Sequence, residues 1–575
     1  MDKYSSFDRN ILYDNDNFNF IGKGQPGGKA ANLIFIKNTL NQAFSDNKFD
    51  NIGINIPKMT VILTNIFDVF MKENNLYEIA YSNHSDDIIA NHFQKASLPA
   101  FIEGDLYTFI SKINKPLAIR SSSLYEDKIN EPLAGLFETK MISNNQFQTS
   151  ARFHKLVEAI KYVYASTFFK NSKNYFTAIG KSIKHEKMAV IIQEIVGKEH
   201  HKRFYPTISG VARSFNYYPS GKSKAEDGVV SLALGLGKTI VDGGKVWNYS
   251  PEHPASPPPF NNIRDMQKMT QTDFWAVNMG KIKEFNPIKE TEYLINPDIT
   301  KAEKDNVIAN ICSTYDIQSD RIYTGQYGKG PRIINFAPIL KTKKLSLNKL
   351  IKKLLKICEK KLNAKVEIEF ALIYEPQNNV PPKFSLLQVR PMVVTKSTID
   401  IDCSQFDSRK VLAFSQNALG NGKNESIRDI VFVKPEVFET KYTRRIAEEI
   451  ETINQTLVNK NKNYLLIGFG RWGTSDPWLG IPIVWNQISG AKVIIENALP
   501  HINPDFSQGS HFFHNVTSFK LFYFYCSINE KPKIDYNWLF KQRCINETNF
   551  VKHVQVERPL KILANGIKGK GIIIK

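Results

Sequence analysis

Two parts of the sequence decide the fold class: Ala118-Ile119-Arg120-Ser121-Ser122-Ser123-Leu124-Tyr125-Glu126-Asp127, and Glu367-Ile368-Glu369-Phe370 with the later Leu387-Gln388-Val389-Arg390-Pro391. Arginine guanidinium groups hold pairs of phosphate oxygens, and serine hydroxyls add further donors. Carboxylate and amide oxygens are ligands for a hard cation such as Mg²⁺. Together these segments predict a site that handles a nucleoside triphosphate with magnesium.

Length and composition describe a globular chain of several domains. The chain has 575 residues, of which 42% are hydrophobic and 12% aromatic, and this length predicts about three or four domains. Its five cysteines include no CxxC pair, which is typical of a reducing compartment. The first residues lack the apolar core of a signal peptide, and no apolar run approaches the roughly 20 residues that span a bilayer. We therefore expect a soluble, cytoplasmic protein without a membrane partner.

The net charge of +20 is compatible with nucleic acid, an anionic surface or phosphorylated substrates as partners. Much of the excess is lysine spread along the chain. In one lysine-rich stretch the apolar residues fall at helical spacing, so that the lysines form the solvent face of an amphipathic helix; these apolar residues are Leu347, Leu350, Ile351, Leu354, Leu355 and Cys358. No zinc-finger or RNA-binding signature accompanies the charge. Nucleic acid is therefore a possible partner but not the favoured one.

The chain divides into two regions. Residues 1–395 alternate strand-like apolar runs with amphipathic helices, which is an α/β pattern. The run Lys58–Thr64 predicts a strand, followed by a helix over 66–73. A polar stretch around Ser397 to Ser408 marks the boundary, so that residues 396–575 form a second region.

The segment Gly22-Lys23-Gly24-Gln25-Pro26-Gly27-Gly28-Lys29 is a glycine-rich turn before a helix predicted from Ala30 to about Leu40. Glycines let the backbone approach a phosphate, and a helix N-terminus supplies N–H donors and positive potential. The spacing is not that of a Walker A loop. A surface turn that contains glycines by chance is an equally good interpretation.

Arg120 follows the apolar run Pro116–Ile119, so we expect it at the end of a short strand. It can hold phosphate there. The alternative is a structural ion pair with Glu126 or Asp127, which is the better interpretation of Arg120 taken alone.

The run Met188–Val196 predicts a buried strand that leaves the core at Gln193 and Glu194. Such a strand end could present edge hydrogen bonds to a nucleotide base, although an ordinary strand end fits as well. Two small-residue segments, Ser209–Ala212 and Leu234–Thr239, are places where the backbone could pass close to a ligand.

Glu369 and Gln388 lie on two strand-like runs joined by a polar, proline-containing segment. A hairpin would place the two side chains side by side as ligands for magnesium. Gln388 and Arg390 are two residues apart and share one face of a strand. One residue could then hold the metal while the next holds the phosphate.

The order of these motifs resembles the nucleotide-binding region of the phosphoenolpyruvate synthase and pyruvate phosphate dikinase family over about the first 395 residues. The motifs in chain order are Gly-Gly-Lys at 27–29, Arg-Ser-Ser at 120–122, Ala-Gly-x-x-Glu-Thr at 134–139, Gln193, Ser-Gly-Val at 209–211, Gly-x-Gly at 235–237 and Glu369 with Gln-x-Arg-Pro at 388–391. The resemblance implies an ATP-grasp fold with ATP between two lobes. It implies phosphate contacts from Lys29, Arg120 and Arg390, magnesium ligands in Glu369 and Gln388, and a base and cofactor site at Gln193, Glu194, Val196 and Gly237.

Three departures from the family pattern affect the expected site. The family often has Gly-Leu-Gly-Glu where this chain has Lys238, so that a carboxylate on the nucleotide or metal side is missing. Arg213-Ser214-Phe215 stands where an aromatic residue and a threonine are usual. The loop between Glu369 and Gln388 is longer than typical. These changes could alter nucleotide choice or rate without abolishing binding.

The family passes phosphate through a swivelling histidine domain marked by Thr-Gly-Gly…Ser-His-Ala, and then to pyruvate in a TIM barrel. Neither motif occurs here, and the roughly 180 residues after 395 are too few for a barrel. We therefore expect that this chain is not a complete phosphoenolpyruvate synthase.

The second region carries a dense motif at 466–477, Leu-Ile-Gly-Phe-Gly-Arg-Trp-Gly-Thr-Ser-Asp-Pro. A strand that enters a glycine-rich turn predicts a loop for phosphate or a small ligand. Downstream, His511 follows small residues and could accept a phosphoryl group or act as a general base. The alternative is a histidine packed among Phe512 and Phe513. For the fold of this region the sequence leaves an α/β and a mainly β domain open.

The expected function is that of an ATP- and Mg²⁺-dependent, dikinase-like phosphotransferase. Its catalytic residues would be Arg120, Arg390 and His511, and the C-terminal region would bind the acceptor, a small molecule or a protein. Two alternatives stay open: a catalytically weak ATP-sensing module, and a nucleic-acid-binding protein.

Overall fold

The computed structural model describes residues 7–9, 18–126, 135–178, 181–219, 221–258, 260, 262–282, 284–342, 344–392, 394, 399–401, 406–474, 476–498, 510–519, 521–527 and 532–575. The chain forms two compact units. The N-terminal unit comprises Met1–Ser214, Asp227–Ile240 and Lys245–Met392. The C-terminal unit comprises Val393–Lys575 together with two short earlier segments, Phe215–Glu226 and Val241–Gly244.

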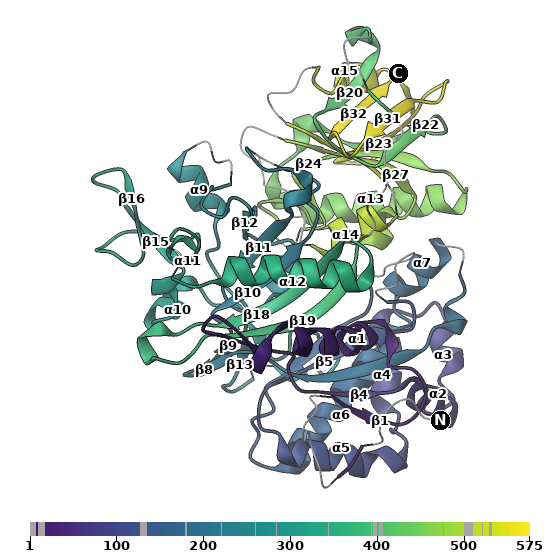
Figure 1. Ribbon diagram of the computed structural model, residues 1–575. Helices are drawn as coiled ribbons and strands as arrows, with labels where there is room; N and C mark the ends of the chain where they lie inside the picture. Colours follow the sequence, from purple (N-terminus) through teal and green to yellow (C-terminus); the bar gives the residue numbers. More distant parts are fainter. Residues whose placement is uncertain are drawn as a thin grey trace. The chain divides into compact units, whose positions relative to one another are not determined.

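The first sheet of the N-terminal unit has the strand order β1-β4-β7-β5-β6, and Figure 1 labels its strands β1, β4 and β5. Its strands are β1 Phe18–Ile21, β4 Met59–Ile62, β7 Met188–Glu194, β5 Leu117–Ser123 and β6 Thr139–Ile142. The helices in this part of the chain are α1 Gly27–Ala43, α2 Thr64–Glu73, α3 Tyr77–Tyr81, α4 Asp86–Lys95, α5 Ala100–Lys112, α6 Thr149–Ser166 and α7 Lys170–Ala178. Aromatic rings from α2, α4 and α6 pack together, with Phe70 against both Phe93 and Tyr164.

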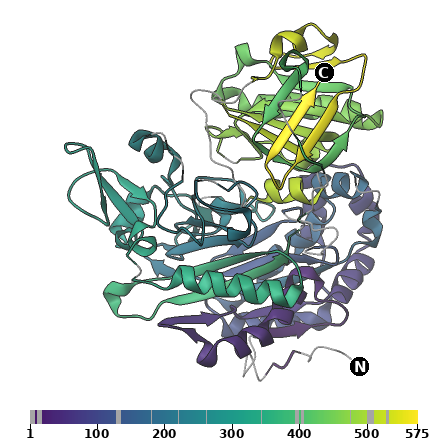
Figure 2. The same ribbon diagram turned by 45° about the horizontal axis from the view of Figure 1, so that its top comes forward.

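The second sheet of this unit has the order β12-β11-β10-β18-β19-β3-β2. Its strands are β12 Trp247–Tyr249, β11 Val229–Ala233, β10 Ile208–Arg213, β18 Val366–Ile373, β19 Lys383–Pro391, β3 Ile52–Asn55 and β2 Lys48–Phe49. Helix α12, Leu347–Leu362, packs on β18 and on α1 and runs beside the sheet in both ribbon views (Figure 2). The six apolar residues that predicted this helix are all buried, which confirms the prediction.

Smaller elements complete the N-terminal unit. One small sheet has the order β14-β13-β9-β8 and another the order β16-β15-β17. Their strands are β8 Lys198–His200, β9 Arg203–Tyr205, β13 Ala276–Asn278, β14 Leu294–Ile295, β15 Cys312–Asp316, β16 Arg321–Thr324 and β17 Arg332–Ile334. The short helices are α8 Lys238–Val241 (which runs one residue into the C-terminal unit), α9 Ile263–Met269, α10 Ile299–Lys304 and α11 Ala337–Leu340.

The C-terminal unit is an α/β fold. Its main sheet has the order β21-β28-β27-β24-β23-β30-β29, and β28, β27, β24 and β23 run parallel to one another. The strands are β21 Asn417–Leu419, β28 Phe522–Cys526, β27 Ala491–Asn497, β24 Tyr464–Phe469, β23 Asp429–Val433, β30 Val551–Gln555 and β29 Arg543–Glu547. Two helices connect parallel strands, α13 Thr443–Asn459 and α14 His511–Ser518. Parallel strands need such crossovers, so the α/β alternative left open by the sequence is the one observed.

A second sheet of the C-terminal unit is antiparallel, in the order β20-β32-β31-β22. The remaining elements of this unit are β20 Val411–Ser415, β22 Asn421–Asn424, β31 Lys561–Asn565, β32 Lys570–Ile574, the short pair β25 Arg471–Trp472 and β26 Gly480–Ile481, and α15 Tyr536–Phe540.

Several predicted boundaries differ from those observed. The strand predicted over 58–64 is β4, and the helix predicted over 66–73 begins two residues earlier, at Thr64, with Leu63 at its N-cap. Helix α1 extends the predicted 30–40 at both ends. Strand β5 continues to Ser123, so Arg120 lies inside the strand and the prediction of a strand end there was wrong. The strand continues through the three serines after Arg120 because all of them pair with β7.

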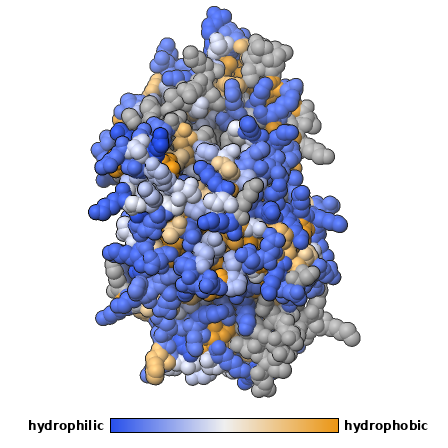
Figure 3. Space-filling model, turned by 60° about the vertical axis from the view of Figure 1, so that its left-hand side comes forward, coloured by the Kyte–Doolittle hydropathy of each residue, from blue (hydrophilic) through white to orange (hydrophobic). Residues whose placement is uncertain are grey.

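The part of the surface in Figure 3 is dominated by polar and charged side chains. Among the described residues, no helix has both the length and the apolar character needed to cross a membrane.

Candidate functional site

Arg120 lies at the centre of the residues that the sequence singled out. Its side chain is 14% exposed. Nη1 donates to Gln193 Oε1 at 3.3 Å and to the Leu387 carbonyl at 3.1 Å. Nη2 donates to Gln388 Oε1 at 2.7 Å and reaches Glu369 Oε2 at 3.5 Å. Arg120 thus connects the first sheet, through β5 and β7, with β18 and β19 of the second.

Glu369 and Gln388 are direct register partners on the antiparallel strands β18 and β19. The hairpin that the sequence predicted is therefore confirmed, with an irregularity just after Glu369. A carboxylate oxygen and an amide oxygen side by side suit Mg²⁺, which usually takes one or two protein ligands and completes its octahedron with water and phosphate oxygens. The described residues contain no cluster of three or more His, Cys, Asp or Glu side chains for a metal, so this pair would act with the nucleotide's own oxygens.

Arg390 lies two residues along β19 from Gln388 and is buried. Its Nε donates to Glu367 Oε1 at 2.6 Å. Arg213 on β10 donates through Nε to the other oxygen of Glu367. Burial raises the pKa of Glu367, but the two guanidinium groups outweigh burial and hold that pKa below its usual value. Glu367 therefore stays a carboxylate that orients two arginines.

Lys29 projects from the first turn of α1 into the loop that follows β5. Its Nζ donates to Glu126 Oε1 at 2.8 Å and to Ser121 Oγ at 3.1 Å. Glu126 is therefore a partner of Lys29, and the alternative that paired it with Arg120 was wrong; Asp127 lies outside the described residues. The correct pairing could not be read from the sequence, because Lys29 and Glu126 are 97 residues apart.

The glycines before Lys29 serve a packing role that the sequence did not predict. A Cβ on Gly28 would lie 1.6 Å from the Glu126 carbonyl oxygen, and one on Gly27 would lie 1.7 Å from that of Ser122. Gly27 also has a φ of +73°, which disfavours a side chain. The two glycines let the start of α1 pack directly on the loop after β5. This close approach is between two backbones of the protein, and the approach of the glycine-rich turn to a phosphate stays a prediction.

Glu186, which the sequence did not single out, supports the same loop. It is 3% exposed, and its Oε1 accepts the N–H groups of Leu124 and Lys187, each at 3.0 Å. Burial raises its pKa to about 7, against the lowering effect of these two bonds. No motif marks a lone glutamate in a connecting segment, so only its burial beside the loop could reveal it.

The residues predicted to contact the base lie on β7 or just after it. Because β7 pairs with β4 on one side and β5 on the other, its backbone is not the free edge that we expected, and that part of the prediction was wrong. Gln193 is buried and accepts from Arg120, while Glu194 forms an ion pair with Lys115 at 2.9 Å. Val196 is half-buried beyond the strand end.

An apolar cluster adjoins these residues. It comprises the buried side chains Ala118, Ile195, Phe204, Leu236, Val277 and Leu294, with Met141, Trp275 and Met279 partly buried against them. The cluster joins β5 with β9, β13 and the turn at Gly235–Gly237. Its six core members are buried, so a planar base, which prefers apolar surroundings, would contact the cluster through the partly buried Met141, Trp275 and Met279.

The turn after β11 carries the first departure from the family pattern. Lys238 begins α8, and its Nζ lies 2.9 and 2.8 Å from the two carboxylate oxygens of Glu290. A carboxylate, that of Glu290 from the segment before β14, therefore lies beside position 238 and is paired with the lysine there.

The comparison with known families decides the identity of this region. The family model described as pyruvate phosphate dikinase, AMP/ATP-binding domain, matches residues 24–409, more than half of the chain. The chain belongs to this family. No curated protein matches the chain. The pyruvate phosphate dikinase family is one of kinase-like enzymes, and the match to its AMP/ATP-binding domain makes residues 24–409 an ATP-binding region.

In the C-terminal unit of this pyruvate phosphate dikinase family member, the glycine-rich turn serves packing. Arg471 is buried, and its Nη1 donates to the carbonyls of Gly243 and Gly244 at 3.2 and 3.3 Å. Thr474 Oγ1 donates to the Gly243 carbonyl at 3.1 Å. In the predicted phosphate loop the Arg471 guanidinium is therefore hydrogen-bonded to backbone carbonyls of the same unit. Ser475 of this loop lies outside the described residues.

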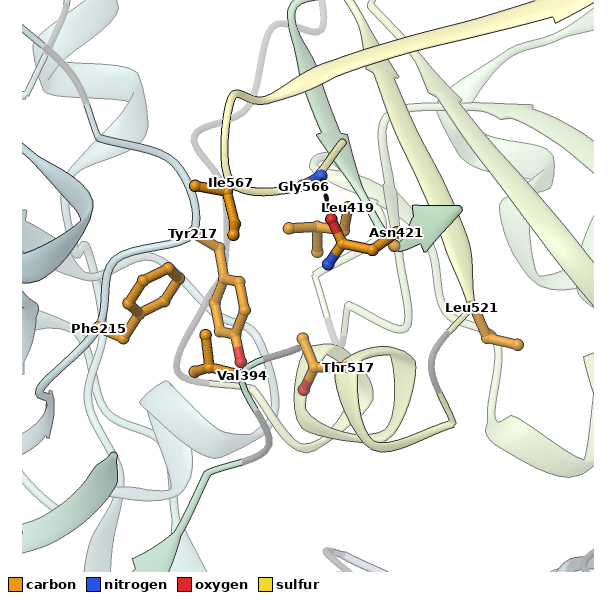
Figure 4. Close-up of a pocket in the computed structure, with 10 residues that line it drawn as sticks. Phe215, Tyr217, Val394, Leu419, Asn421, Thr517, Leu521, Gly566 and Ile567 are labelled. Atoms are coloured by element: carbon orange, nitrogen blue, oxygen red, sulfur yellow. Dashed lines mark hydrogen bonds between the residues drawn. The ribbon is translucent and has the colours of Figure 1, made fainter. Parts of the chain in front are cut away.

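His511 is the first residue of α14, whose N-cap Ser510 accepts the N–H of Phe513 at 3.2 Å. The ring of Phe513 packs on Tyr217, Tyr218 and Tyr523. A small pocket in this unit is lined by Tyr217, Asn421 and Thr517 among others, and Figure 4 shows Gly566 donating its N–H to Asn421 Oδ1 at 2.9 Å. His511 is not among the residues that line this pocket.

Proposed function

We propose that the protein is an ATP- and Mg²⁺-dependent phosphotransferase of the dikinase type. The observation that carries the proposal is the convergence of Arg120, Glu369 and Gln388 where the two sheets of the N-terminal unit meet. A guanidinium beside two oxygen ligands is the arrangement that phosphoryl transfer needs, because the reaction depends on positioning and charge neutralisation more than on covalent help.

In this proposal Arg120, Lys29 and Arg390 bind the phosphate chain, and Glu369 with Gln388 holds the magnesium ion. When bound, the magnesium ion would neutralise part of the negative charge of the phosphate chain. Arg120 now donates to Gln388 and lies near Glu369, so ATP binding requires it to turn part of its guanidinium from these oxygens toward phosphate. The partly buried side of the apolar cluster, at Met141, Trp275 and Met279, receives the base. Gln193 and Val196 lie at its border, and Gly237 lies in the adjoining turn.

We further propose that residues 396–575 form an acceptor-binding or regulatory domain. His511 is our candidate for a phosphoryl acceptor or a general base, because an imidazole at a helix N-terminus lies where N–H groups favour an anion. Replacing His511 by asparagine should abolish any acid-labile, alkali-stable phosphoprotein formed with ATP. Detection of that species in His511→Asn would remove this role.

A second candidate, an ATP-sensing module with weak catalysis, is favoured by one contact. Gly243 and Gly244 follow Lys238 by only a few residues. Their carbonyls accept hydrogen bonds from Arg471. A change in the nucleotide-binding turn can therefore pass along a short, tethered segment to the C-terminal unit.

One experiment separates these functions. The protein is incubated with ATP and Mg²⁺, with and without candidate acceptors, and AMP and ADP are quantified. A dikinase releases AMP, a kinase releases ADP, and a sensor binds ATP with little turnover. Glu369→Gln should lose at least about tenfold in turnover, whereas Glu375→Gln, which changes a carboxylate paired with Lys198, should retain it. Unchanged turnover in Glu369→Gln would show that the proposed metal site is wrong.

A further inference from the structure

Two charged rows cross the second sheet of the N-terminal unit side by side. In the first row Glu369 on β18 pairs with Gln388 on β19. In the second, two residues away, Arg213 on β10 pairs with Glu367, and Glu367 pairs with Arg390. Residues two apart on a strand share a face, so both rows project from the same side of the sheet. Their separation along the strands is about 7 Å.

The second row places two guanidinium groups on one carboxylate. Arg213 donates to Oε2 of Glu367, and Arg390 donates to Oε1. All three side chains are at most 2% exposed. Removal of Arg213 would leave the Glu367 carboxylate paired with Arg390, so the neutralisation of Glu367 does not require a second arginine.

Burial of a charged side chain costs free energy, which an ion pair and hydrogen bonds offset in part or in full according to their geometry. Arg213 pairs with Glu367, whose other partner Arg390 is a proposed phosphate ligand, and Glu367 fixes both guanidinium groups on this face. The proposed magnesium ligands, Glu369 and Gln388, lie in the neighbouring row on the same face.

We propose that Arg213 is a further phosphate-binding residue of the ATP site, acting beside Arg390 on the phosphate chain of a nucleoside triphosphate. This inference rests on the proposed function. In this proposal the two arginines of the second row bind phosphate oxygens, and the metal ligands lie in the neighbouring row. Glu367 then acts as a positioning residue that holds both guanidinium groups in register.

If Arg213 binds the phosphate chain, the loss of affinity caused by its substitution should depend on how many phosphates the nucleotide carries. An arginine with only a structural role would not give this dependence. Arg213→Met keeps an unbranched apolar side chain in the buried position and leaves Glu367 with Arg390, so the fold should persist. Its affinity for Mg²⁺–ATP should fall by about ten- to a hundredfold, since a charged hydrogen bond is lost. Its affinity for AMP should stay within about twofold of wild type, because AMP does not carry the β- and γ-phosphates. Arg213→Lys should recover part of the ATP affinity.

The measurement is calorimetric titration of the full chain with Mg²⁺–ATP, Mg²⁺–ADP, AMP and inorganic tripolyphosphate, with circular dichroism to verify folding. The matched control is Arg203→Gln, which removes an arginine from another ion pair of the same unit, with Asp305 at 2.7 Å, and should leave the ATP-to-AMP affinity ratio unchanged. If Arg213→Met does not fold, Arg213→Lys and tripolyphosphate binding carry the test.

The outcomes separate the two proposals. Equal losses for ATP and AMP in a folded Arg213 variant, or no loss at all, would overturn the role of Arg213 while wild-type ATP binding still supports the proposed function. Failure of the wild-type protein to bind ATP or tripolyphosphate would overturn both.

Discussion

Replacement of Glu186 by glutamine should make the N-terminal unit more stable at alkaline pH. Burial raises the pKa of Glu186 from its usual value near 4.5 to about 7 in the folded protein. The folded state therefore favours the protonated acid. The stability contributed by this proton is complete below pH 4.5, and it is lost as the pH rises through about 7.

The magnitude follows from the pKa difference. Each pKa unit corresponds to about 1.4 kcal/mol, so a rise from 4.5 to about 7 costs the folded wild type about 3 kcal/mol at pH 8. Glu186 is 3% exposed, so solvent screens little of this energy. Glutamine mimics the protonated acid, and its Oε1 can still accept the N–H groups of Leu124 and Lys187.

The assay is urea unfolding of wild type and Glu186→Gln at pH values from 4.5 to 8, followed by circular dichroism. The difference in free energy of unfolding between the two proteins should be near zero at pH 4.5 and reach about 3 kcal/mol in favour of the variant at pH 8. Glu103→Gln, at an exposed position on α5, should show no such change with pH. A constant difference across the range, or a variant less stable than wild type at pH 8, would refute the reasoning.

Three further predictions concern the candidate site. Gly28→Ala should lower the melting temperature and weaken ATP binding, because the added Cβ would overlap the Glu126 carbonyl oxygen. The control Gly53→Ala, whose Cβ would have its nearest atom at 3.7 Å, should have little effect on either quantity. Equal melting curves for the two variants would contradict this prediction. Lys238→Glu and Glu290→Lys should each weaken ATP binding measured by calorimetry. The double variant with both substitutions should bind ATP better than the sum of the two single losses predicts, by a coupling energy of about 1 kcal/mol. Additive losses would show that the pair does not act together. Chelation of Mg²⁺ by EDTA should reduce ATP affinity in the same titration by about tenfold or more, and unchanged affinity would exclude a metal-assisted site.

Local sequence patterns were sufficient for several parts of the fold. The period of the apolar residues predicted α12, because a helix in contact with a sheet must bury one face. The two runs around Glu369 and Gln388 predicted their own pairing, because strands joined by a short segment of chain form a hairpin. The order of motifs along the chain predicted the family, which the match over residues 24–409 supports.

Long-range pairings could not be predicted in the same way. Arg120 was expected at a strand end and beside Glu126; the structure places it inside β5, where β7 continues to pair with the serines that follow. The edge expected at Gln193 is absent because β4 and β5 flank β7. Each of these differences reflects the identity of a neighbouring strand, which the residues of one segment do not specify.

The sequence by itself determined which chemical groups the protein carries: arginines for phosphate, a carboxylate and an amide for a hard cation, and a glycine-rich start to a helix. Tertiary structure alone decided which of these groups meet. Lys29 pairs with Glu126, and Glu186 supports the loop after β5. Glu367 pairs with the nearby Arg390 and also with Arg213, which is 154 residues away in the chain. The physical reason is that an ion pair and a shifted pKa both depend on distance and burial, and strand register sets these only after the chain has folded.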